Sequence, residues 1–219
     1  MRLLLLRHGQ TPDNVQGILG TVVPGPALTS LGTRQAAALP ASITEPIAAI
    51  AVSTMVRTQL TGAPLAADRG LEPTVFDGLR EVEAGTYEGR NDRASVAAYL
   101  RTFCSWAAGD LDVRNPGAEN GHDFFARYDA ALAAAFASIP AGGTLAVVSH
   151  GAAIRAWVGL RSSNTGATFT LDRPLENTGL AELEGDVKSG WTLLSWQGEP
   201  VGGVQLEDRT VTDPIGHEI

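Results

Sequence analysis

The chain has 219 residues, of which 44% are hydrophobic, and this composition excludes an intrinsically disordered protein. The formal net charge of -8 argues against general nucleic-acid binding and against docking on anionic membranes, so an anionic substrate needs a local cluster of arginines. The single cysteine, Cys104, excludes an intrachain disulfide and fits a reducing compartment, and we expect it to pack within a helix.

The N-terminal residues do not predict a targeting segment. The apolar run from Leu3 to Leu6 is followed at once by Arg7, whereas a secretion signal needs roughly 7–15 apolar residues. No stretch approaches the roughly 20 apolar residues of a membrane span. We therefore expect a soluble, cytoplasmic protein with no membrane partner.

The first half of the chain alternates predicted strands and helices. A buried strand at 3–6 is followed by a Gly- and Pro-rich loop at 10–28 and by a helix that Thr29 or Ser30 caps. A strand at 47–52 precedes a helix that carries Arg57 and that Ser53 or Thr54 caps. Residues 74–76 predict a short edge strand.

The second half is richer in helix. Residues 77–92 and 110–121 predict loops on either side of a helix at 94–108. Asn120 caps a helix whose apolar face carries Phe125, Tyr128, Leu132 and Phe136. A second buried strand ends at Ser149, and a helix at 152–160 and a hairpin of 177–183 with 191–196 follow. Residues 198–219 show no periodicity and form a C-terminal tail.

These elements predict one α/β domain over residues 1–219. We expect a three-layer sandwich, in which a mostly parallel sheet lies between helices on both faces. The helix-rich stretch at about 91–138 is expected to be a cap-like insertion over the edge of the sheet.

Two short stretches of the same design indicate a site. The runs 3–9 and 146–151 each consist of apolar residues that end in His-Gly, at His8 and His150. Ligands of open α/β sheets bind beyond the carboxyl ends of the strands. A single histidine of this kind most often only marks the end of a strand. Here two histidines are expected at the same edge, and further polar residues lie near His8 in the sequence: Arg7, Gln10, Thr11 and Asn14.

Five residues together suffice for phosphoryl transfer without a metal or a cofactor: Arg7, His8, Arg57, Glu81 and His150. Two guanidinium groups can bind a phosphate, and a neutral histidine can attack phosphorus. A second histidine adds a hydrogen-bond donor, and a carboxylic acid can protonate the leaving oxygen. None of the ligand spacings typical of zinc sites is present, so no metal site is expected.

The segment Arg7-His8-Gly9-Gln10-Thr11 resembles the signature of the histidine phosphatase superfamily, also called the phosphoglycerate mutase-like family. Further segments resemble the family's motifs in the family's order over residues 2–183: Asn14, 28–32, 53–59, 79–89, 116–119 and 148–151. The resemblance implies an α/β fold with one antiparallel edge strand and a helical insertion over the active site.

The resemblance also implies a role for each matching residue. His8 would be the phosphorylated nucleophile, and Glu81 would be the general acid and then the general base. The phosphoryl group would be bound by Arg7, Arg57 and His150, helped by Gln10, Thr11, Asn14 and the backbone N–H of Gly151. Glu83 is a rival for the acid, Glu119 could cap a helix or border the pocket, and His122 and His217 are expected at the surface.

Members of this family are phosphatases, mutases or non-catalytic modules. The stretch 83–89 resembles the phosphatase pattern, which favours a metal-independent phosphomonoesterase acting on a small phosphorylated metabolite. The alternatives are phosphoglycerate mutase-type transfer and a module that only binds a phospho-ligand, although such a module is expected to lack one of the main site residues. The largely apolar loop at 18–26 favours an uncharged or partly apolar leaving group.

No nucleic-acid partner is expected. The sequence leaves open whether the protein forms a homodimer.

Overall fold

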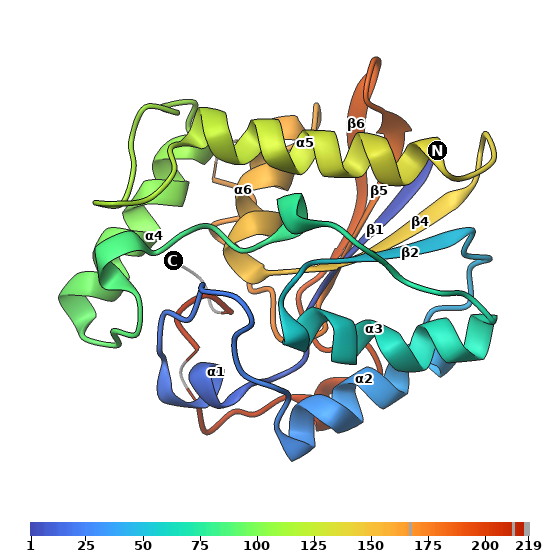
Figure 1. The fold of residues 1–219 in the computed structure, drawn as a ribbon, viewed down its shortest axis with the longest axis horizontal. Coiled ribbons are helices and arrows are strands. Elements are labelled where there is room, and N and C mark those ends of the chain that lie inside the picture. Colours follow the sequence, from blue (N-terminus) through green and yellow to red (C-terminus); the bar gives the residue numbers. More distant parts are fainter. Residues whose placement is uncertain (167, 212, 217–219) are drawn as a thin grey trace.

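The computed structural model describes residues 1–166, 168–211 and 213–216. A six-stranded sheet in the order β3-β2-β4-β1-β5-β6 forms the middle layer (Figure 1). Its strands are β1 (Arg2–Arg7), β2 (Ala49–Val52), β3 (Thr74–Val75), β4 (Thr144–Ser149), β5 (Leu180–Asp186) and β6 (Gly190–Gln197). The first four run parallel, which confirms a mostly parallel sheet.

The alternation of side chains along β1 builds two separate cores. Leu3 and Leu5 belong to the larger core on one face of the sheet, and Leu4 and Leu6 belong to the smaller core on the other face. Because successive side chains of a strand point to opposite faces, a continuous apolar run is what a strand covered on both sides requires.

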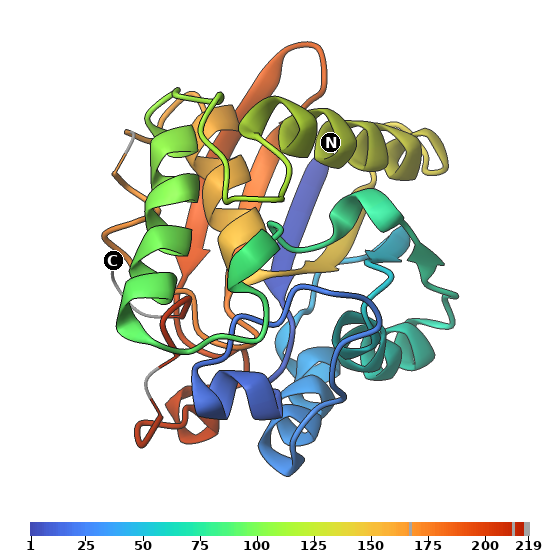
Figure 2. The same ribbon diagram turned by 60° about the vertical axis from the view of Figure 1, so that its left-hand side comes forward.

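Helices cover both faces of the sheet, as expected (Figures 1 and 2). The smaller core is closed by α2 (Ser30–Ser42) and α3 (Val56–Arg69), and the larger core by α4 (Arg93–Ala107), α5 (Gly121–Ala137) and α6 (Gly151–Arg161). Cys104 packs against the larger core from α4. The four residues predicted to share one face of α5 are all buried there.

Three local predictions are wrong. The loop after β1 contains a short helix, α1 (Pro12–Gln16), which a capping box between Thr11 and Asn14 starts. Neither Ser53 nor Thr54 caps α3, which begins after Met55 without a side-chain cap. The antiparallel strand is β5, and it lies one place inside the sheet because β6 pairs with it and forms the edge.

The remaining segments connect these layers. The stretch between β3 and α4 contains two 3-10 turns, Asp77–Leu79 and Gly85–Tyr87, and a third turn, Val204–Leu206, lies in the C-terminal tail. The α4–α5 stretch contributes side chains to the larger core, and its role as a cap stays a prediction. Among the described residues, no helix is long and apolar enough to cross a membrane.

Candidate active site

The register of the parallel strands brings the two histidines together. Arg7 at the end of β1 is paired with Ser149 at the end of β4, so the residues that follow them, His8 and His150, leave the same edge of the sheet. The His8 backbone N–H donates to the Ser149 carbonyl oxygen at 3.0 Å, and the two imidazole rings lie 5.3 Å apart between centroids.

His8 is buried, and one hydrogen bond fixes its tautomer. Its Nδ1 lies 2.8 Å from the Gly9 carbonyl oxygen, and because a carbonyl can only accept, Nδ1 must carry the proton of the neutral ring. Burial lowers the pKa of His8 well below its usual range, and the positive charges of Arg57 and Arg7 lower this pKa further. The ring is therefore neutral, and the lone pair of Nε2 is left to react.

The ring of His150 is fixed from behind by Ser53. The Ser53 hydroxyl lies 2.9 Å from His150 Nε2 and accepts a hydrogen bond from the Met55 backbone N–H at 3.2 Å. His150 Nδ1 is buried without a hydrogen-bond partner among the described residues, and burial lowers the pKa of His150 well below its usual range.

Two buried guanidinium groups flank the histidines. Arg57 donates from Nη2 to the Gly20 carbonyl oxygen at 3.1 Å, and Arg7 donates from Nη1 to the Leu175 carbonyl oxygen at 2.8 Å. The second Nη of Arg7 forms an ion pair with Asp213. In both arginines the Nε atom is buried and has no partner within the described part of the chain. Such groups are ready to donate to an anion.

Glu81 is held at the N-terminus of α6. Its Oε1 accepts the backbone N–H groups of Val82 at 2.9 Å and Ala153 at 2.8 Å, and its Oε2 accepts that of Ala152 at 3.3 Å. Burial raises the pKa of Glu81 despite these bonds and the opposing charge of Arg57. A carboxyl group with a raised pKa is suited to donate a proton near neutral pH.

Arg127 fixes the loop that carries Glu81. Its Nη2 donates to the Glu81 carbonyl oxygen at 2.9 Å, its Nη1 donates to two further carbonyls of the same loop, and Glu119 forms an ion pair with it. Glu119 thus supports the loop rather than capping a helix. Glu83 accepts the Glu119 backbone N–H at 3.2 Å and does not line the pocket, whereas Glu81 does.

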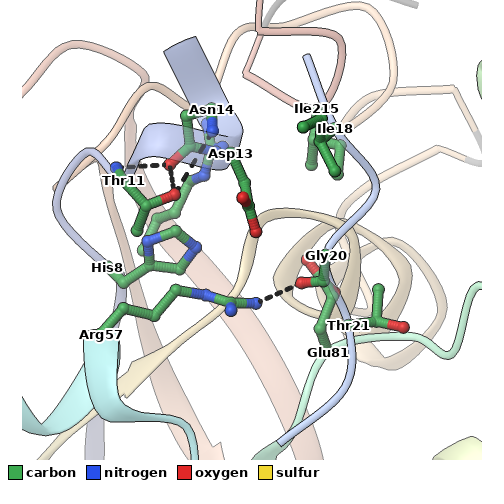
Figure 3. A pocket seen from close by; sticks show the side chains of 11 residues that line it. His8, Thr11, Asp13, Asn14, Ile18, Gly20, Thr21, Arg57, Glu81 and Ile215 are labelled. Carbon is green, nitrogen blue, oxygen red and sulfur yellow. Dashed lines mark hydrogen bonds between the residues drawn. The ribbon is translucent and has the colours of Figure 1, made fainter. Parts of the chain in front are cut away.

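A small pocket opens in front of His8. Its lining consists of Arg7, His8, Thr11, Asp13, Asn14, Ile18, Gly20, Thr21, Arg57, Glu81 and Ile215. Figure 3 shows the Asp13 carboxylate pointing into the space between His8, Arg57 and Gly20. Ile18 and Ile215 form an apolar part of the wall on the far side of that space.

The other predicted site residues lie around this pocket in different ways. Thr11 and Asn14 line it and are bonded to each other through the capping box of α1. Gly151 lies at the first position of α6 and does not line the pocket, so phosphate binding by its backbone N–H stays a prediction. The amide of Gln10 is directed elsewhere, with Oε1 accepting from Thr29 and Nε2 donating to Asp208. Phosphate binding by Gln10 stays a prediction.

His122 does not line the pocket. His122 is exposed and lies 3.4 Å from Asp112, while His217 lies outside the described residues. Within the described ranges, no group of three or more His, Cys, Asp or Glu side chains is arranged to hold a metal ion.

A family model described as the histidine phosphatase superfamily, branch 1, matches residues 3–198. The chain belongs to this superfamily. Among solved structures, a mycobacterial glucosyl-3-phosphoglycerate phosphatase is similar to it, with a TM-score of 0.75 and 27% sequence identity over 90% of this chain and 98% of that one.

Two curated relatives are similar to this chain over part of their own length. The PE-PGRS family protein PE_PGRS11 of Mycobacterium tuberculosis is 35% identical over 225 residues, which are 95% of this chain and 38% of the relative. Adenosylcobalamin/alpha-ribazole phosphatase of Salmonella typhimurium is 29% identical over 125 residues, which are 57% of this chain and 60% of the relative. The chain thus spans less than two thirds of the length of either relative.

Sequence reasoning from the histidine phosphatase motifs missed four residues of the site. Asp13 and Ile215 line the pocket, Ser53 contacts His150, and Asp213 contacts Arg7. Asp13 is inside the signature loop and could have been found from its position beside Asn14. Asp213 and Ile215 lie in the tail, where no periodicity or motif signals a contact with a loop more than 200 residues earlier.

Proposed function

We propose that the chain is a metal-independent phosphatase that hydrolyses a small phosphomonoester through a phosphohistidine on His8. The observation that carries the proposal is the buried, neutral His8, whose Nδ1 is bonded to Gly9 and whose Nε2 is free in a pocket lined by two guanidinium groups. Glu81 lines the same pocket with a raised pKa, as a proton donor requires.

In the first step, His8 Nε2 attacks phosphorus and the bond between phosphorus and the ester oxygen breaks. Glu81 donates its proton to that oxygen, which leaves as an alcohol. In the second step, a water attacks the phosphohistidine, Glu81 takes the proton of the water, and the bond between phosphorus and nitrogen breaks. Inorganic phosphate leaves, and His8 and Glu81 return to their starting forms.

The charges of the pocket suit this chemistry. The transferring phosphoryl group carries its charge on its non-bridging oxygens, and catalysis consists mainly of positioning it and stabilising that charge. The unpartnered Nε atoms of Arg7 and Arg57 supply donors for these oxygens. His150 adds a donor through Nδ1 when Ser53 donates to its Nε2.

The wall of the pocket favours a leaving group without a negative charge. Asp13 would repel a second anionic group, and Ile18 and Ile215 offer apolar contacts. We therefore propose a substrate whose alcohol part is uncharged, partly apolar or cationic. The substrates in the names of the similar proteins differ from one another, so the lining of this pocket is the better guide.

Phosphate release from a panel of phosphomonoesters tests the proposal, with a chelator present and with His8→Ala as the comparison. The panel contains an aryl phosphate, sugar phosphates, nucleotides and phosphoglycerates. Chelator-resistant turnover that disappears in His8→Ala supports the proposal. Turnover that survives in His8→Ala contradicts the mechanism, and phosphate binding without any turnover indicates a non-catalytic binding module. A substrate range restricted to bisphosphates contradicts the proposed leaving group.

A further inference from the structure

The described residues of the C-terminal tail, 198–211 and 213–216, reach the active site although the tail follows the part of the chain that the family model matches. It packs beside α1 and the loop after β1 (Figures 1 and 2). Gln35 Nε2 donates to the Leu206 carbonyl oxygen at 2.8 Å, and Gln10 Nε2 donates to Asp208 Oδ2 at 3.0 Å. Further along, the Leu175 backbone N–H donates to the Gly216 carbonyl oxygen at 2.8 Å.

Asp213 of this tail is the charged partner of Arg7. The side chains are 1% exposed for Arg7 and 8% for Asp213, so the ion pair is nearly free of solvent. Asp213 uses Oδ2 for Arg7, and its Oδ1 accepts the Ile215 backbone N–H at 3.1 Å, which fixes the carboxylate in a tight turn. Removing one partner of a buried ion pair is strongly unfavourable, so Asp213 contributes, together with the Leu175 carbonyl, to fixing the position of Arg7.

The unpartnered Nε of Arg7 lies where the tail meets the active-site helix. Its two Nη atoms bond Leu175 and Asp213, whereas its Nε has no partner among the described residues. A methyl group added at Gly151 would lie 3.0 Å from this Nε and 2.5 Å from Cγ2 of Ile215. The Nε of Arg7 therefore faces the start of α6. Ile215, the tail residue that lines the pocket, lies next to it.

We propose that Asp213 is a positioning residue of the active site. By holding the far side of the Arg7 guanidinium, it directs the free Nε toward the phosphoryl group, and with Ile215 it makes the tail part of the phosphate pocket. The catalytic consequence rests on the proposed phosphatase function. The structural consequence is that the pocket binds phosphate through a correctly placed Arg7. This can be measured whether or not the protein turns over a substrate.

A double-mutant cycle on the full chain tests this proposal with Asp213→Ala, Arg7→Ala and the double variant. The affinity for inorganic phosphate is measured by calorimetry, and kcat/KM by phosphate release. In the wild-type background, Asp213→Ala should lower phosphate affinity and kcat/KM by about tenfold each, because Arg7 loses its position. In the Arg7→Ala background, the same substitution should change both by less than about twofold.

Losses of equal size in both backgrounds would mean that Asp213 acts on the fold and not through Arg7, and would overturn the proposal. An unchanged phosphate affinity in Asp213→Ala would overturn it as well. Because Asp213→Ala leaves a buried charge, the cycle is repeated with Asp213→Asn, which keeps an oxygen acceptor and the side-chain volume. The control is Arg209→Gln, which breaks an exposed ion pair with Glu207 in the same tail and should change neither quantity.

The two readouts separate this proposal from the proposed function. If the wild-type protein binds phosphate but hydrolyses nothing, the proposed function fails, and the cycle on phosphate affinity still decides the role of Asp213. If the protein is an active phosphatase and the cycle is additive, the role of Asp213 fails alone.

Discussion

At the scale of single residues, His8 and Glu81 have pKa values shifted in opposite directions. The proposed mechanism requires His8 without a proton on Nε2 and Glu81 with its proton. The pKa of His8 is lowered and that of Glu81 is raised, mainly by burial in both cases. Rate therefore rises as pH increases through the pKa of His8 and falls as pH increases through the pKa of Glu81. Arg57 lowers both pKa values, since its positive charge disfavours imidazolium and favours carboxylate.

Replacing Arg57 by Gln should move the whole pH profile to higher pH. Without the positive charge, the pKa values of His8 and Glu81 both rise, so both limbs of kcat/KM against pH shift in the alkaline direction. Arg57→Lys keeps a positive charge and is the matched control, which should keep both limbs near those of the wild type. Limbs of Arg57→Gln that coincide with the wild-type limbs contradict this electrostatic role.

Asp13 should determine how the enzyme treats charged leaving groups. We expect wild-type kcat/KM to be higher for 2-aminoethyl phosphate than for phosphoglycolate, whose carboxylate Asp13 repels. Asp13→Asn should lower the ratio of these two kcat/KM values by about tenfold, as the removal of a unit charge from a partly buried wall predicts. The exposed Asp110, which does not line the pocket, gives the control variant Asp110→Asn. A ratio that Asp13→Asn leaves unchanged would falsify the assignment.

At the scale of elements, the ends of strands and the starts of helices place the chemistry. Thr29 and Asn120 cap α2 and α5 as their residue types predict. Ser53 has the same kind of side chain, yet its hydroxyl is used by His150. The first turn of α2 lies against the backbone of Gln10, and this approach requires glycine at position 32. A methyl group at Gly32 would lie 2.2 Å from the Gln10 carbonyl oxygen.

Removal of the α5 cap should reduce stability and leave catalysis intact. Asn120 accepts the Asp123 backbone N–H at 3.0 Å, and Asn120→Ala should lower the free energy of unfolding by about 1 kcal/mol, or Tm by about 2–4 °C. Asn120→Ser, which keeps a capping oxygen, should lose much less. Thermal unfolding and kcat/KM measured on the same samples check this, and a Tm equal in all three proteins would show that the cap contributes nothing.

At the scale of the whole molecule, local patterns predicted most of the fold and most of the side chains that meet in the candidate site. The apolar runs before His8 and His150 predicted two buried strands, and parallel pairing then placed both histidines at one edge. The contacts of Asp213 and Ile215 could not be predicted, because burial of a tail against a distant loop depends on tertiary packing. The order of β5 and β6 could not be predicted for the same reason. The resemblance implies one antiparallel strand but does not say which strand pairs with it.

The buried neutral histidines should make the folded state sensitive to acid. The pKa of His8 lies well below 6.5 in the folded protein, whereas 6.5 is the ordinary value expected in the unfolded chain. At pH values between the two, the unfolded chain binds more protons than the folded protein, so stability falls as pH decreases. From pH 6.5 to 5.5, the wild type should lose about 1 kcal/mol more unfolding free energy than His8→Asn, which cannot bind this proton. Urea unfolding at the two pH values measures this difference, and equal losses in both proteins contradict it.

The phosphoenzyme itself tests the central claim most directly. The protein is mixed with an aryl phosphate, quenched at alkaline pH to preserve phosphohistidine, and analysed by peptide mass spectrometry. Glu81→Gln is included because it cannot activate the water of the second step, so the phosphoenzyme should accumulate in it. The account predicts one phosphoryl group on His8, most abundant in Glu81→Gln and absent from His8→Ala. Turnover with no phosphoryl group on His8 in any of these proteins would contradict the account.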